Sequence, residues 1–139
     1  NNDGIASLNA LLPPPEKRGL IFIDPSYEIK DEYKTIPTAL KATYSKFETG
    51  VYCLWYPVLN KKLTEQFIRR LSAIEAKNTL RVEFNLTSKN AAGMTGCGLW
   101  IINPPFTFAE EMKTACTTLK ELFNPGESSF IIELNPHKA

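Results

Sequence analysis

The chain has 139 residues, of which 43% are hydrophobic and 22% are charged, and its formal net charge is +1. These values are typical of one globular domain with a sizeable core, and the charge gives no sign, over the whole chain, of a polyanion-binding protein. No apolar stretch reaches the roughly 18 residues of a membrane span and no signal-peptide pattern opens the chain. We therefore expect a cytoplasmic protein.

Helical and strand periodicities alternate along the chain. The predicted helices cover residues 5–12, 30–47, 63–77 and 108–123, and the predicted strands cover residues 20–23, 51–56, 79–86, 99–102 and 130–134. We expect Pro37 to kink or split the second helix, and Pro57 to close the second strand. This order predicts a layered α/β fold. No glycine-rich strand-to-helix turn precedes the first strand, so we interpret residues 1–139 as the C-terminal half of a longer protein.

The first predicted strand ends at the motif Asp24-Pro25-Ser26-Tyr27. An apolar run bounded by turn formers is typical of a buried strand in a parallel sheet, and open α/β sheets bind ligands beyond the carboxyl ends of their strands. The motif resembles the Asp-Pro-Pro-Tyr motif of adenine-N6 methyltransferases. In such a site Asp24 and the carbonyl of Pro25 would accept hydrogen bonds from the adenine amino group, and Tyr27 would stack on the base. The alternative is a strand-end turn with a solvated aspartate.

A second motif of this kind, Asn103-Pro104-Pro105-Phe106, follows the predicted strand 99–102. Its amino-acid sequence is the closer match to the Asn-Pro-Pro-aromatic motif of many amino methyltransferases. Its position is the poorer match, because the catalytic motif of that fold follows the fourth strand, and residues 79–102 are typical of the paired strands beyond it. We therefore rank Asp24 first and interpret Asn103 as a decoy or as part of a pocket wall.

Asp3 and Gly4 precede the first predicted helix. In class I methyltransferases an acid in this place accepts a hydrogen bond from the adenine amino group of the cofactor, and the following glycine allows close approach of the backbone. An N-cap aspartate is the simpler explanation from spacing alone.

The remaining polar and aromatic groups give weaker signals. Trp55 stands near the end of its strand, where it either lines the substrate side or forms a packed aromatic corner. Basic pairs such as Lys61-Lys62 are mostly solvated faces, although one or two could contact phosphates. The three cysteines have neither zinc nor disulfide spacing, so we predict no metal site and reduced thiols.

Four ordered blocks of the chain resemble the RlmJ family of bacterial 23S ribosomal RNA adenine-N6 methyltransferases, which use S-adenosylmethionine. The blocks are residues 18–28, 49–57, 93–98 and 102–105, and the resemblance covers nearly the whole chain. It implies a Rossmann-like class I methyltransferase sheet with mostly parallel strands and an antiparallel terminal strand. Residues 1–139 are then the C-terminal half of that domain.

The resemblance also implies the site residues. Asp24 is expected to be the catalytic proton acceptor and a neighbour of the cofactor, and Asp3 and Gly4 are expected to bind the cofactor. Asn103 is not catalytic in this comparison. Ser26 stands where the family more commonly has proline, and we expect it to be tolerated because only the turn shape and the neighbouring carbonyl are needed.

The expected substrate contacts come from Ser26, Tyr27 and Trp55, and the expected partners are protein-free 23S ribosomal RNA and the N-terminal half of the same protein. Two alternatives stay open. The same chemistry could act on DNA, because the motif reads an extruded adenine and not the sugar. The chain could also belong to a nucleic-acid-binding protein without turnover, since family members have been linked to the use of external DNA as a nutrient.

Overall fold

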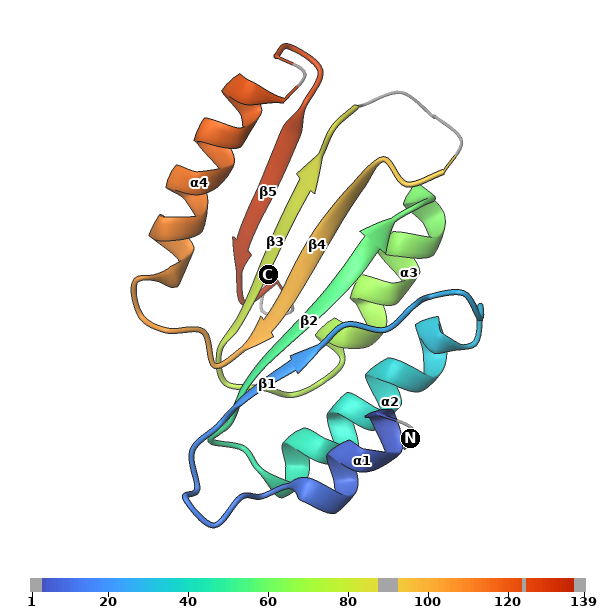
Figure 1. Cartoon of the computed structure of the whole chain (residues 1–139), viewed down its shortest axis with the longest axis vertical. Coiled ribbons are helices and arrows are strands. Elements are labelled where there is room, and N and C mark those ends of the chain that lie inside the picture. The colour runs from blue at the N-terminus through green and yellow to red at the C-terminus, as the bar shows by residue number, and fades with distance from the viewer. Residues whose placement is uncertain (1–3, 88–92, 124, 137–139) are drawn as a thin grey trace.

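The computed structural model describes residues 4–87, 93–123 and 125–136 of the chain. These residues form a five-stranded sheet with helices on both faces (Figure 1). Each predicted helix and strand is found, and the observed elements are α1 Gly4–Leu11, β1 Leu20–Ile23, α2 Glu32–Lys46, β2 Val51–Val58, α3 Lys61–Ser72, β3 Thr79–Asn85, β4 Gly96–Ile102, α4 Phe108–Leu122 and β5 Ser129–Leu134. The predicted α/β class is confirmed. Among the described helices, none has the length and apolar character to cross a membrane.

The strands lie in the order β1-β2-β4-β3-β5. Only β1 and β2 pair in parallel, whereas β2–β4, β4–β3 and β3–β5 are antiparallel. The expectation of mostly parallel strands with one antiparallel terminal strand is therefore wrong for this chain. The segment between β3 and β4 is shorter than the crossover of about a dozen or more residues that a parallel pair needs, so these two strands are antiparallel. β4 inserts between β2 and β3 and therefore also runs antiparallel to β2. The expected pairing of the strands within residues 79–102 is confirmed.

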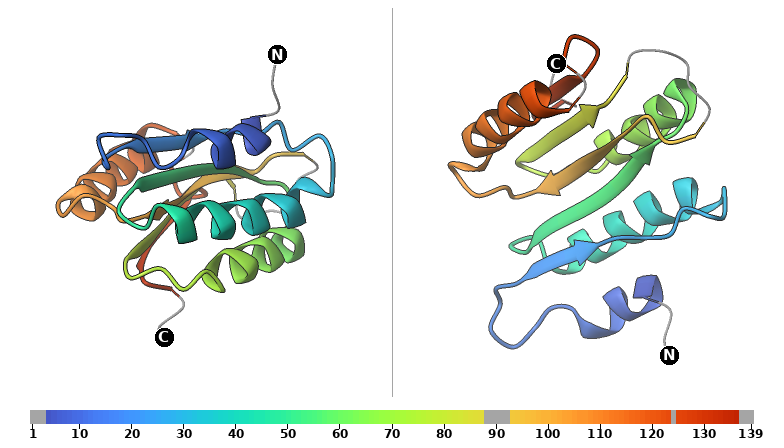
Figure 2. Two further views of the ribbon diagram at one scale, coloured as in Figure 1. Left: turned by 90° about the horizontal axis from the view of Figure 1, so that it is seen from below. Right: turned by 45° about the horizontal axis from the view of Figure 1, so that its top comes forward.

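Alternate residues of the strands face two separate cores. Tyr52 and Tyr56 of β2 lie in the larger core, which α2 and α3 cover. Leu80 of β3 and Ile101 of β4 lie in the smaller core with Cys116 of α4. Figure 2 shows α2 and α3 on one side of the sheet and α4 on the other. The two faces of the sheet are therefore built from different helices.

Pro37 does not split its helix, contrary to expectation, because α2 runs unbroken from Glu32 to Lys46. Proline has no N–H to donate to the carbonyl of Tyr33, four residues earlier. The guanidinium of Arg70 on α3 donates to that carbonyl instead, at 3.4 Å. A neighbouring helix thus replaces the bond that the proline removes.

Pro57 does not close β2 either, since the strand continues to Val58 and Pro57 pairs with Cys97 of β4. On its other side β1 pairs with β2 only as far as Leu54. No described strand lies beside Pro57 on that side, and a proline is tolerated at such an open strand edge.

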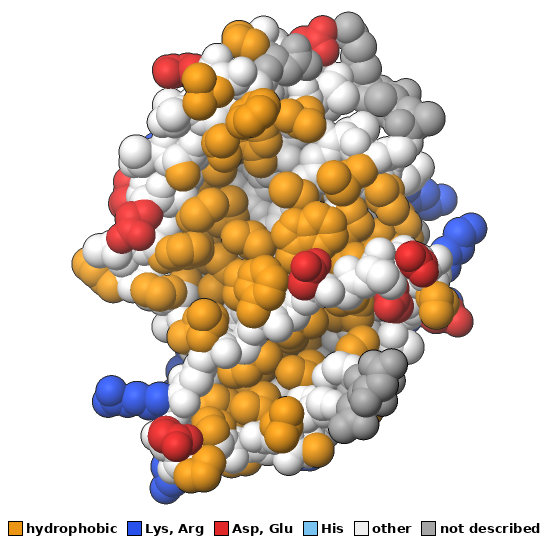
Figure 3. Space-filling view, viewed as in Figure 1, with side chains coloured by type: hydrophobic (Ala, Val, Ile, Leu, Met, Phe, Trp, Pro, Cys, Tyr) orange, Lys and Arg blue, Asp and Glu red, His pale blue; other side chains and the backbone are white. Residues whose placement is uncertain are grey.

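One face of the sheet is only partly covered by helix. α4 packs on β5 and β3, and Leu20 and Phe22 of β1, on the part of the face away from α4, are 70% and 60% exposed. Figure 3 shows hydrophobic side chains spread over this side of the molecule. We call this surface the open apolar face. It consists of the exposed Leu20 and Phe22 and, between them and α4, of the half-buried Val51, Cys53 and Leu99.

Candidate active site

Asp24 stands directly after β1, at the edge of the sheet where β1, β2 and β3 all end (Figure 1). β1 and β2 are parallel, and β3 runs in the same direction because it is antiparallel to β4, which is antiparallel to β2. The carboxyl ends of strands are the usual ligand-binding edge of an α/β sheet. Asp24 is exposed, so a ligand can reach its carboxylate.

A pocket of about 300 Å³ lies at Asp24. It is lined by residues from three segments, namely Gly4, Ile5 and Leu8 of α1, Phe22, Ile23, Asp24 and Pro25 at the end of β1, and Glu32 of α2. The structure thus brings together Asp24, Pro25 and Gly4, which the sequence assigned to one site. Asp3, the other expected cofactor residue, lies outside the described residues. The volume is at the lower end of the range for small-molecule sites.

Gly4 is not required by packing within the described part of the chain. A Cβ built on Gly4 would meet no heavy atom within 4 Å. The space around such a Cβ is therefore free of described protein atoms.

Tyr27 turns back into the larger core instead of presenting its ring to solvent. Its backbone lies in the left-handed region (φ 54°), its ring is 7% exposed, and its hydroxyl donates to the carbonyl of Trp55 at 2.6 Å. The ring contacts Tyr33, Trp55 and Phe67 at centroid distances of 5.0, 6.1 and 5.9 Å. In this arrangement no face of the ring is open to a stacked base.

The same surroundings change the acidity of the Tyr27 phenol. Burial raises the pKa of Tyr27 well above its ordinary value, and the nearby Tyr33, Glu32 and Asp24 raise it further. The hydroxyl is therefore neutral at physiological pH and acts as a hydrogen-bond donor that fixes the turn after Asp24.

Trp55 and Ser26 have different surroundings. Trp55 is half-buried, packs against Tyr27 and is absent from the lining of the pocket at Asp24. The contact with Tyr27 agrees with the packed aromatic corner, and the place of Trp55 on the substrate side stays a prediction. Ser26 is exposed in the turn, so its side chain is accessible from solvent.

The second motif lies at the opposite edge of the sheet. β4 runs against β1 and β2, so Asn103 follows β4 at the edge where β2 begins. Its Nδ2 donates to the carbonyls of Glu48 at 2.7 Å and Gly50 at 2.8 Å, and its φ is 56°. Asn103 therefore holds the turn before β2, away from Asp24, while Phe106 of the same motif is fully exposed.

A comparison with known proteins decides the family. The family model described as Ribosomal RNA large subunit methyltransferase D, RlmJ, matches residues 1–133. The chain belongs to the RlmJ family. The resemblance inferred from the four sequence blocks is thereby confirmed.

Individual RlmJ relatives match most of this chain. Two proteins named Ribosomal RNA large subunit methyltransferase J are similar to it: one from Haemophilus influenzae at 37% identity over 134 residues (95% of this chain, 48% of the relative), and one from Escherichia coli at 36% over 125 residues (89% and 45%). A crystal structure of a Legionella pneumophila protein matches with 62% identity and a TM-score of 0.90, over 95% of this chain and 49% of that one. The chain thus spans about half the length of the relatives it matches.

The pocket of this RlmJ chain also contains Glu32, which sequence reasoning missed. Its Oε2 is buried without a hydrogen-bond partner among the described residues, and its side chain lines the same pocket as Asp24. A buried carboxylate oxygen without a partner costs free energy, and a ligand with an N–H or O–H group would satisfy it. The sequence signal was weak, because acids are common in the first turn of any helix.

Proposed function

We propose that this chain is part of an S-adenosylmethionine-dependent methyltransferase that methylates N6 of an adenine in 23S ribosomal RNA. The proposal is supported by membership of the RlmJ family and by the similarity to two proteins named Ribosomal RNA large subunit methyltransferase J. The observation that carries it is the position of Asp24 and Pro25. Both follow a parallel strand at the ligand-binding edge and line one pocket with Gly4.

The chain itself we propose to be the C-terminal half of a Rossmann-like class I methyltransferase domain. β1 has a strand partner on one side only within the described residues, and such an unpaired edge favours pairing with another strand. The open apolar face exposes Leu20 and Phe22 beside that edge, and a large exposed apolar surface marks a contact site. The missing half of the same protein would cover both features, which fits a chain that spans about half of its relatives.

In this reaction the methyl donor needs no activation by the protein, whereas the adenine amino group does. S-adenosylmethionine, when bound, supplies a methyl group that needs no further activation. The adenine nitrogen is a poor nucleophile because its lone pair is delocalised into the ring. The Asp24 carboxylate and the Pro25 carbonyl would each accept a hydrogen bond from N6, which favours a pyramidal nitrogen and stabilises the positive charge that develops there. When N6 gains the methyl group, Asp24 would accept the proton that N6 loses.

The residues present fit the cofactor. Asp3 and Gly4 would face its adenine and Asp24 the transferred methyl group, in the role that the family resemblance gives them. The open space beside Gly4 and the unpartnered Oε2 of Glu32 are two observations of this chain that favour a polar ligand in the pocket.

We propose a positioning role for Tyr27 rather than the stacking role first expected. The bond from its hydroxyl to Trp55 fixes the turn that presents Asp24 and Pro25. Base stacking would require the ring to leave the contacts with Tyr33 and Phe67.

The proposal is tested with the full-length protein and labelled S-adenosylmethionine. Unmodified 23S ribosomal RNA should accept label at N6 of one adenine, identified by nuclease digestion and mass spectrometry, and Asp24→Asn should abolish the transfer. Asp31→Asn is the matched control, because Asp31 is also exposed but lies outside the pocket. Labelling of DNA in preference to RNA, or of another atom, would contradict the proposal.

A further inference from the structure

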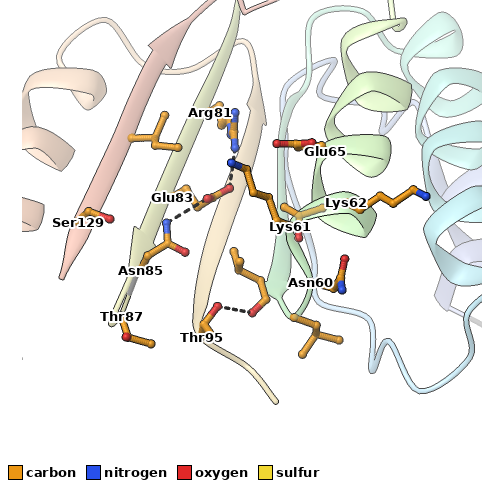
Figure 4. A pocket seen from close by; sticks show the side chains of 14 residues that line it. Asn60, Lys61, Lys62, Glu65, Arg81, Glu83, Asn85, Thr87, Thr95 and Ser129 are labelled. Carbon is orange, nitrogen blue, oxygen red and sulfur yellow. Dashed lines mark hydrogen bonds and ion pairs between the residues drawn. The ribbon is translucent and has the colours of Figure 1, made fainter. Parts of the chain in front are cut away.

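A second hollow, of about 850 Å³, lies between the start of α3 and the face of β3 and β5 (Figure 4). We call it the α3–β3 groove. It shares no lining residue with the pocket at Asp24. The residues that line it are Val58, Leu59, Asn60, Lys61, Lys62, Thr64, Glu65, Arg81, Glu83, Asn85, Thr87, Thr95, Ser129 and Ile131.

The polar wall of the groove follows from the alternation of β3. Leu80 and Val82 point into the core under α4, so Arg81, Glu83 and Asn85 point to the opposite face. α2 and α3 cover the neighbouring strands on that face but leave β3 and β5 open to the groove. A row of three polar side chains thus forms one wall.

That wall is held rigidly by its own hydrogen bonds. Glu83 is 5% exposed and accepts from the Tyr56 hydroxyl at 3.1 Å, from Arg81 at 2.9 Å and from Asn85 at 3.1 Å. Arg81 also pairs with Glu133 at 3.1 Å. Beneath them, a Cβ on Gly98 would overlap the Tyr56 ring, so glycine is what lets that ring pack there.

Charge in this wall is stable over the physiological range. Burial alone lowers the pKa of Arg81, but its hydrogen bond to Glu83 and the nearby Tyr56 and Glu83 raise it above the ordinary value. Arg81 is therefore a fixed cation offset by two carboxylates, and its buried Nε has no partner among the described residues. The wall is therefore polar but carries no net positive charge.

The opposite rim carries two lysines and one acid, since the exposed Glu65 also lines the groove. Figure 4 shows the Lys61 side chain directed toward the β3 wall and the Lys62 side chain directed away from it. Lys61 and Lys62 stand in the first turn of α3, both exposed, and no ion pair holds either one within the described part of the chain. A groove with polar side chains on one wall and two exposed lysines on the other rim matches a single-stranded nucleic acid, whose base edges are polar and whose phosphates are anionic.

The position of the groove relates it to the site of methyl transfer. It lies where β2 and β3 end, and Asp24 lies where β1 ends, at the same edge of the sheet. We propose that the α3–β3 groove binds a single-stranded segment of ribosomal RNA beside the target adenine. Lys61 and Lys62 would contact its phosphates, and the polar wall of Arg81, Glu83 and Asn85 would face its bases. This inference rests on the proposed function, since it names a further contact surface for the same substrate.

The test measures RNA binding by the full-length protein without a methyl donor. Lys61→Ala combined with Lys62→Ala should raise the Kd for protein-free 23S ribosomal RNA about tenfold, and should reduce the slope of log K against log salt concentration by about 1–2. The matched control is Lys113→Ala with Lys120→Ala on α4, which removes the same charge from the other side of the sheet. Equal effects of the two pairs would overturn the proposal.

A second variant separates binding in the groove from attraction at its rim. Ser129 is exposed and lines the groove, so Ser129→Trp should fill the hollow without removing a charge and should raise the Kd to a similar extent. Unchanged binding by this variant, with an unchanged melting temperature, would also overturn the proposal. These experiments measure RNA binding and not methyl transfer. If the protein binds RNA as expected but does not methylate it in the separate transfer assay, only the proposed function is contradicted.

Discussion

Two strand-end motifs of the same type, with Asp or Asn before a proline and an aromatic residue in fourth place, lie at opposite edges of the sheet. Asp24-Pro25-Ser26-Tyr27 follows a strand that runs parallel to its neighbour, and it opens on a pocket. Asn103 and its two prolines follow a strand that runs the other way, and the asparagine amide is used up by two backbone carbonyls. Strand direction, rather than the residues of the motif, decides which of the two motifs lies at the edge of the sheet with the pocket.

Removal of the Asp24 carboxylate should have the largest effect on catalysis. Asp24→Ala in the full-length protein should lower the methyl-transfer rate by about 10²–10³, the usual loss for one preorganised polar group. The fold should be unaffected because Asp24 is exposed. Initial rates with 23S ribosomal RNA and a thermal melt check both parts. A rate near that of the wild type would make Asn103 the next candidate and would reverse the comparison of the two motifs.

Asn103→Ala should have the opposite profile. Loss of its two hydrogen bonds to the carbonyls of Glu48 and Gly50 should reduce the free energy of unfolding by about 1–3 kcal/mol. The rate per folded molecule should stay the same. Urea unfolding and activity at a temperature well below the melt measure the two quantities. Asn103→Gly, which keeps the positive φ without strain but not the bonds, is the control for the backbone.

High pH should lower the stability of the folded protein through the phenol of Tyr27 in the first motif. The pKa of its phenol is raised by burial in the folded state, so the folded protein holds this proton at a pH where the unfolded chain releases it. The stabilisation is complete below about pH 10 and is lost at up to about 1.4 kcal/mol per pH unit above it. Thermal melts between pH 9 and 11 should show this loss, and Tyr27→Phe should show less of it. An equal slope for both proteins would mean that Tyr27 titrates normally.

Tyr27→Phe should have the smallest effect of the series. Loss of the hydroxyl bond to Trp55 should reduce stability by about 1 kcal/mol at neutral pH and should lower the transfer rate modestly by loosening the turn. Tyr27→Ala should cost far more, because it leaves a cavity beside Phe67. If Tyr27→Phe left the transfer rate unchanged and only Tyr27→Ala lost affinity for RNA, the results would instead support stacking of the Tyr27 ring on the base.

The sequence predicted most of the fold because each element has a clear period. Residues 79–86 alternate and form β3, and the helical stripe from Phe108 forms α4. The errors came from long-range contacts. Pro37 stays in its helix because Arg70, far along the chain, bonds the carbonyl it leaves free, and local pattern contains no sign of that.

The candidate site divides in the same way. The position of Asp24 followed from the strand pattern and its turn, and the structure places it at a pocket with Gly4. Tyr27 was expected to face a ligand, but its backbone has a positive φ and its ring lies in the core. The sign of φ at one residue cannot be predicted from a four-residue motif. Glu32 was missed because its burial depends on how α2 packs beside β1.

The central claim is that the adenine to be methylated binds at Asp24 and not at Asn103. The most direct measurement is a crystal structure of the full-length protein with S-adenosylhomocysteine and adenosine. We expect the adenosine amino group within hydrogen-bond distance of the Asp24 carboxylate and the Pro25 carbonyl, with the cofactor product on the side of Gly4. Adenosine at the Asn103 edge of the sheet, with Asp24 in solvent, would contradict the account.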